Sequence, residues 1–158
     1  MSVGARNDPF TAYRFSVEID GIIAAGFAEV SGLDVEIETE ESQEGGVNTH
    51  SHTLPTRATY PNLTLRRGTT DLPLLYKWTE SVVNGTVLRL PVLVFMLDET
   101  GVPTWGWSVR KAYPVKWSGP QLQADQGTVA MESVELAHEG ISKIPGLPFA
   151  TKPLRELV

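Results

Sequence analysis

The sequence predicts a mainly β domain with a single helix, on three observations. Apolar and polar residues alternate in several short runs, which is typical of half-buried strands. The 14 glycines and 11 prolines are spread along the 158 residues and separate these runs, as turn residues do. Only the segment 71–83 has the spacing of an amphipathic helix.

The expected strands follow one another with short connections. In 13–20, apolar residues occupy every second position, and Asp20-Gly21 then marks a two-residue hairpin turn. The returning strand is expected at 22–30, broken by Gly26. Later strands are expected at 62–68, 87–97, 105–117 and 128–138. The run 87–97 is apolar on both faces, so it is expected to be buried on both, inside the domain or against another subunit.

The helix is expected to span Asp71 to Val83. Thr70 or Asp71 can cap it, and Pro73 suits its first turn. Asn84-Gly85 ends it. Its core face carries Leu75, Trp78 and Val82, with Leu74 beside them.

The segment 33–40 predicts a strand with one apolar face and one row of carboxylates. Asp34, Glu36, Glu38 and Glu40 share that row. Like charges along one strand face repel, so this face should be solvated or matched by a basic partner. A polar stretch of about twenty residues then runs to Tyr60, and so long a stretch in a compact domain usually has a function.

Aromatic residues also share an alternating pattern. Trp105, Trp107, Tyr113 and Trp117 are expected on one face of their strand, where such residues form core or subunit interface more often than a platform for sugars. The end of the chain, 142–158, contains Pro145, Pro148 and Pro153 and is expected to be an extended arm.

Composition excludes several functions. The net charge of −6 argues against binding to nucleic-acid phosphates, and the absence of cysteine excludes thiol chemistry and disulfides. No signal peptide, lipidation signal or membrane helix is expected. His50 and His52 have no third metal ligand, the acidic run lacks the spacing of a calcium loop, and the pair His138-Glu139 has no nucleophile elbow to complete a triad. We therefore expect no catalytic, metal or cofactor site.

A set of segments resembles the tail-tube proteins of contractile phage tails and related injection particles. The segments are DPFTAYRFSVEIDG, AGFAEVSGLDVEIETEESQEGG, LPTRATYPNLTLRRG, LYKWTESV and AYPVKWSGPQLQADQGTVAMESVELAHEGI. They cover roughly residues 8–141 in the family's order. The type VI secretion tube protein is a more distant relative of that family.

The resemblance implies a small antiparallel β-barrel or two-sheet sandwich over residues 1–141, with an N-terminal arm at about 1–9 and one flanking helix. It implies a structural subunit and not an enzyme. Hexameric rings would stack into a hollow tube that carries DNA or protein cargo. The other partners would be a sheath protein, the baseplate or spike hub, and tube-end proteins, with assembly in the cytoplasm and no membrane contact.

The resemblance also assigns candidate contact residues. Asp34, Glu36 and Glu38 would face the lumen or the sheath, with the lumen preferred. Lys77, Glu80 and Ser81 on the helix would face the sheath. The loop 40–60 would reach the adjacent ring through Glu40, Glu41, Ser42, Gln43, Glu44, Gly45, Gly46, Asn48, His50 and His52.

The chain departs from the family in continuing for eighteen residues beyond His138-Glu139-Gly140. This arm would bind a neighbouring subunit through Ile144, Leu147, Phe149 and Leu154, or mark a tube protein specialised for the baseplate end. A carbohydrate-binding sandwich that uses the tryptophan face is the alternative from a different class of protein.

Overall fold

The computed structural model describes residues 14–24, 27–42, 52–69, 73–125 and 127–145. Within these residues no helix is long and apolar enough to cross a membrane. The elements are β1 Phe15–Ile19, β2 Ile22–Ala24, β3 Phe27–Ser31, β4 Glu36–Ser42, β5 His52–Thr59, β6 Leu63–Gly68, α1 Leu74–Val83, β7 Leu90–Leu97, β8 Pro103–Ser118, β9 Met131–Ala137 and β10 Ile141–Lys143.

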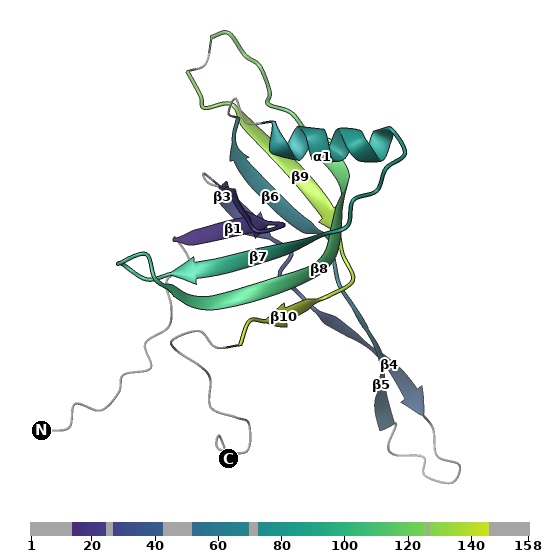
Figure 1. Ribbon diagram of the computed structural model, residues 1–158. Helices are drawn as coiled ribbons and strands as arrows, with labels where there is room; N and C mark the ends of the chain where they lie inside the picture. Colours follow the sequence, from purple (N-terminus) through teal and green to yellow (C-terminus); the bar gives the residue numbers. More distant parts are fainter. Residues whose placement is uncertain (1–13, 25–26, 43–51, 70–72, 126, 146–158) are drawn as a thin grey trace, which may run out of the picture.

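Eight strands form one antiparallel sheet that folds back on itself like a sandwich (Figure 1). Its order is β2-β1-β7-β8-β9-β6-β3, with β10 also paired to β8. The first half of the 16-residue β8 pairs with β7, and its second half pairs with β9. This confirms the expected mainly β fold with one helix, in a sandwich-like form.

The core lies between the two halves of this sheet. Every second residue of the paired strands points inward, as the alternation predicted. Val17, Ile19, Val92 and Val94 come from one half and are almost fully buried, and they pack with Leu63, Leu65, Val134 and Leu136 from the other half. Burial of this kind is worth roughly 1.5–3 kcal/mol for each side chain.

The segment 22–30, expected as a returning strand interrupted at Gly26, forms two separate strands. β2 pairs with β1, whereas β3 pairs with β6 in the other half of the sheet. β7 is only partly as expected, because Val92 and Val94 are buried whereas Leu93 and Phe95 on its other face are only half-buried.

The aromatic residues of β8 do not share one face, because two bulges change the alternation. One extra residue lies near Lys111, which has a φ of 52°, and the second shift lies between Pro114 and Lys116. Trp107 and Trp117 therefore lie opposite core residues of β7 and β9, whereas Tyr113 points to the other face. Half-buried tryptophans on the core side leave no continuous platform for a sugar.

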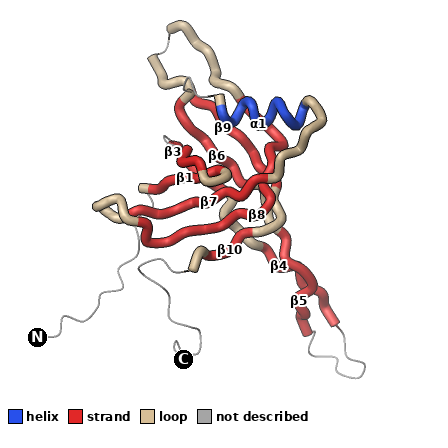
Figure 2. The backbone as a smooth tube through the Cα atoms, in the orientation of Figure 1, coloured by secondary structure: helices blue, strands red, loops and turns tan. Residues whose placement is uncertain are grey.

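Helix α1 begins at Leu74, three residues later than expected, and residues 70–72 lie outside the described part. Leu75 and Trp78 are buried, and the Trp78 indole donates a hydrogen bond to the Leu88 carbonyl oxygen at 2.9 Å. The helix covers one end of the sandwich, against β8 (Figure 2). Asn84 and Gly85 close its C-terminus, as predicted.

A buried ion pair joins β6 and β9. Arg67 Nε lies 2.6 Å from Glu132 Oε1, and the two side chains are 3% and 6% exposed. The indole of Trp117 donates to the other carboxylate oxygen at 3.1 Å. The Arg67 guanidinium also lies over the Phe27 ring, 5.8 Å from its centroid. A buried pair of opposite charges thus extends the core beyond the inward-facing leucines and valines of β6 and β9.

Replacing Trp78 by alanine should lower the free energy of unfolding by about 3–5 kcal/mol, because a buried aromatic side chain leaves a cavity. Chemical denaturation measures this. The control is Lys77→Ala on the exposed side of the same helix, which should change stability by less than about 0.5 kcal/mol. Equal stabilities of the two variants would contradict the core position of Trp78.

Replacing Glu132 by glutamine should cost about 3–5 kcal/mol, because it leaves the Arg67 charge buried without its counter-charge. The matched control is Glu29→Gln, which removes the exposed partner of Arg66 at 3.7 Å. Exposed pairs are worth about 0–1 kcal/mol, so the control should unfold almost as the parent does. A Glu132→Gln variant as stable as the control would overturn this interpretation.

Candidate functional site

A two-stranded hairpin projects from the sandwich. β4 and β5 pair only with each other in the described part of the chain, from Glu36 opposite Thr59 to Ser42 opposite His52 (Figures 1 and 2). Within the polar stretch 40–60, residues 40–42 and 52–59 are therefore strand, and they belong to the two paired strands of the hairpin. Gln43, Glu44, Gly45, Gly46, Asn48 and His50 lie outside the described residues.

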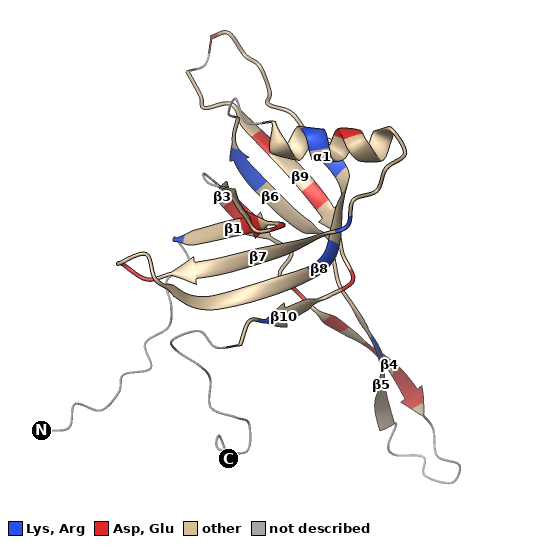
Figure 3. Ribbon diagram, in the orientation of Figure 1, with Lys and Arg blue, Asp and Glu red and all other residues tan. Residues whose placement is uncertain are grey.

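Most charged residues of the hairpin lie on β4 and are acidic (Figure 3). Glu36, Glu38 and Glu40 occupy alternate positions of β4 and share one face. Arg57 lies directly opposite Glu38 and donates to both carboxylate oxygens, at 2.5 and 3.3 Å. The acidic row is thus partly matched within the chain, which the sequence analysis did not anticipate. Asp34 precedes the strand and is exposed.

The other face of the hairpin is apolar and uncovered. Ile37 is 58% exposed, and Val35, which precedes the strand on the same side, is 53% exposed. Leu54 is also more than half exposed, but it lies opposite Glu40 and so belongs to the charged face. Val35 and Ile37 thus belong to the apolar face that the alternation predicts, and this face is exposed because the strand leaves the sandwich. Exposed apolar residues grouped on a projecting element are typical of an interaction surface.

A bulge shapes the arm midway along its length. The pairing shifts after Glu38, and Thr56 is the extra residue of β5. The Thr56 hydroxyl donates to the Glu38 carbonyl oxygen at 3.0 Å. Pro55, which has no N–H to donate, is tolerated next to the bulge. Bulges increase local twist, so the outer half of the hairpin is turned relative to its root.

The root of the hairpin is fixed by glycine. Gly32 has a φ of 91°, and a Cβ there would collide with the Asn62 carbonyl oxygen. Residues 32 and 62 flank the hairpin, so this close approach brings its two ends together. Only glycine allows both the conformation and the contact.

His138 ties the hairpin root to the end of β9. Its Nε2 lies 3.0 Å from the Pro61 carbonyl oxygen, and its Nδ1 accepts the Gly140 N–H at 3.1 Å. Because Nδ1 accepts, Nε2 carries the proton and donates to Pro61. The Tyr60 ring lies 5.8 Å from the imidazole, centroid to centroid. A side chain at Gly140 would collide with Arg110, so this junction is closely packed.

The remaining predicted residues lie in three places. Lys77 and Glu80 are exposed on α1, whereas the Ser81 hydroxyl donates to the Trp78 carbonyl oxygen at 2.6 Å and is half-buried. Ile144 donates its N–H to Gly106 of its own chain at 2.9 Å, and residues 142 and 143 belong to β10. Leu147, Phe149 and Leu154 lie outside the described residues.

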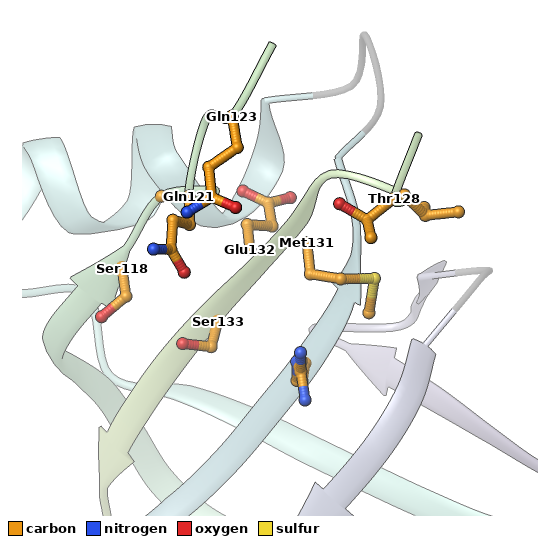
Figure 4. A pocket seen from close by; sticks show the side chains of 10 residues that line it. Ser118, Gln121, Gln123, Thr128, Met131, Glu132 and Ser133 are labelled. Carbon is orange, nitrogen blue, oxygen red and sulfur yellow. The ribbon is translucent and has the colours of Figure 1, made fainter. Parts of the chain in front are cut away.

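The sequence analysis missed a polar pocket of about 440 Å³. It lies between the segment 118–133 and Arg66 of β6 (Figure 4). Its walls are mainly hydroxyl and amide side chains, which carry no periodic signal in a sequence.

Nothing in the described residues assembles a reactive centre. They contain no group of three or more His, Asp or Glu side chains that could hold a metal ion. The pKa of Asp98 is lowered because its carboxylate accepts hydrogen bonds from the Thr100 side chain and from the Val102 and Thr100 N–H groups. Asp98 lies in the tight turn between β7 and β8, so its low pKa is explained by the turn.

The folded sheet and the projecting hairpin define a structural subunit that presents an interaction arm. Residues 11–142 match the family described as "T4-like virus tail tube protein gp19", and the chain belongs to that family. It is therefore a tube-forming structural subunit of a phage tail or contractile injection particle, and not an enzyme.

Solved structures have the same fold. A chain in the extended-state sheath/tube terminator of the PVC contractile injection system is 25% identical, with a TM-score of 0.80 and coverage of 89% of this chain and 99% of that one. A chain in the anti-feeding prophage baseplate is 24% identical, with a TM-score of 0.78 and coverage of 88% and 97%. Hcp1 from Flavobacterium johnsoniae is 15% identical, with a TM-score of 0.52 and coverage of 84% and 95%. No curated protein matches the sequence.

Removing the His138 side chain should loosen the hairpin root. His138→Ala loses both hydrogen bonds and should cost about 1–3 kcal/mol, at roughly 0.5–1.5 kcal/mol for each bond. His138→Asn keeps an acceptor for the Gly140 N–H and should cost about half as much. Amide exchange near Asn62 should accelerate in both variants. His52→Ala on the exposed hairpin is the control, and parent-like exchange in His138→Ala would contradict the tether.

Proposed function

We propose that the chain assembles into hexameric rings and that the β4–β5 hairpin joins each ring to the next in a stacked tube. The observation that carries this proposal is a paired, bulge-shaped arm that contributes nothing to the core. Its apolar face has no partner within the described chain. Exposure of apolar side chains to water is unfavourable, so covering this face with another molecule lowers the free energy. Ring closure would also cover the outer strands of the sheet.

The acidic residues are better explained by the arm than by a lumen wall. Glu36 and Glu38 lie on the projecting hairpin, outside the eight-stranded sheet (Figure 3). Arg57 already neutralises Glu38. We infer that Glu36, Glu40 and Glu41 give the ring contact its charge specificity. Charged residues around a contact select partners and orientation more than they add affinity.

Helix α1 is the proposed contact with a sheath. Lys77 and Glu80 are exposed on it, and it lies on the outside of the sandwich (Figure 1). Similar chains occur in a PVC sheath/tube terminator and in an anti-feeding prophage baseplate, which supports sheath, tube-end and baseplate proteins as partners. A hollow tube has a lumen, and we infer that this lumen carries DNA or protein cargo.

Electron microscopy of the purified protein over a concentration series tests ring and tube formation. The parent should give rings or tubes with a central hole. Monomers at every concentration, also when sheath and baseplate partners are added, would contradict the proposal.

Charge reversal tests the role of the hairpin. Glu40→Lys with Glu41→Lys should leave the thermal midpoint within about 2 °C of the parent, because exposed substitutions change stability little. Mean tube length should fall several-fold. The control is Glu80→Lys on α1, which should leave the tube length unchanged when no sheath is present. Tubes of the double variant as long as those of the parent would contradict the assignment of the hairpin to ring stacking.

A further inference from the structure

The two ends of the molecule differ in shape. The hairpin projects at one end, and the described residues of the loop after β8, 119–125 and 127–130, lie at the opposite end (Figure 1). Copies that stack in one direction bring unlike ends together, which makes a heterologous contact that repeats along the stack. The hairpin of one copy then approaches the loop end of a copy in the next ring. This step rests on the proposed function.

The loop end holds the polar pocket. Its lining includes Arg66, Ser118, Gln121, Gln123, Thr128 and Ser133, and Figure 4 shows their side chains around the hollow. Its volume of about 440 Å³ is enough for several side chains but small for a folded element. The hydroxyl and amide groups there can donate hydrogen bonds to carboxylates.

The charge of the pocket suits an acidic arm. Arg66 is 53% exposed, and its ion pair with Glu29 is long, at 3.7 Å, between two exposed side chains. Glu132 also lines the pocket, but Arg67 neutralises it within the core. Arg66 is therefore the cation that an incoming carboxylate meets. Glu40 and Glu41 are exposed near the outer end of the hairpin.

Apolar residues on the two elements also match. Leu122 and Val129 on the loop are 84% and 77% exposed. On the hairpin, Leu54 lies opposite Glu40 and is 52% exposed, and Ile37 on the other face is 58% exposed. A contact between them would remove both sets from water, which is favourable at roughly 25 cal/mol for each Å² of apolar surface.

We propose that this pocket receives side chains from the Glu40–Glu41 end of the β4–β5 hairpin of a second copy of the chain in the neighbouring ring. Arg66 binds the Glu40–Glu41 end of the arm, the amides of Gln121 and Gln123 complete the polar contact, and Leu122 and Val129 cover its apolar side. Each subunit would thus give an arm at one end and accept an arm at the other.

The absence of native cysteine allows a direct test by cross-linking. Tubes of the Glu41→Cys, Gln123→Cys double variant are oxidised and analysed on a non-reducing denaturing gel. The matched control is Glu41→Cys with Lys77→Cys, which places the second thiol on α1. We expect a ladder of linked chains longer than one ring in the first variant only, because a contact within a ring ends at that ring's copy number.

A ladder of equal strength in the control, or tubes of the first variant that remain unlinked, would overturn the assignment of the pocket. Charge exchange gives a second readout. Arg66→Glu should shorten tubes at least two-fold, Lys77→Glu should not, and Arg66→Glu combined with Glu41→Arg should restore length. If hairpin variants shorten tubes but Arg66→Glu does not, the hairpin stacks rings through another surface, and the proposed function stands without this pocket.

Discussion

The continuous pairing of β8 is the constraint on which the rest of the fold depends. This strand pairs with β7 and β10 along its first half and with β9 along its second. Its two bulges keep core residues pointing inward on both sides of the bend. Without the bulge near Lys111, Val109 and Ala112 could not both face the interior, because they are three residues apart. This one strand joins the two halves of the sandwich and provides the surface on which α1 packs. Its Trp117 also donates a hydrogen bond to Glu132 of the buried Arg67–Glu132 pair.

The hairpin is separate from that core yet held firmly to it. Gly32 and Asn62 meet at its root, and His138 ties the returning chain to the end of β9. A force on the arm is therefore passed to the sheet and not absorbed by a flexible joint. That arrangement suits a subunit that contacts other subunits through a projecting hairpin.

Alternation was enough to predict β1, β6, β9 and the core face of α1, because these elements bury one side only. It also placed Arg67 and Glu132 in line with inward leucines and valines, and their opposite charges were a signal that went unused. The bulges of β8 could not be predicted, since one inserted residue reverses the faces without changing composition. Alternation also predicted a strand at 33–40, which overlaps β4, but the returning strand β5 was missed, because its residues are almost all exposed and follow no apolar alternation.

The exposed β4–β5 hairpin also affects how free subunits behave before they assemble. Its outer backbone edges and its apolar face invite pairing with any other extended chain. A row of carboxylates on the opposite face makes two such arms repel each other when they approach side by side. The same residues that we assign to recognition would then act as a solubility device, which keeps free subunits apart until an acceptor of opposite charge is present.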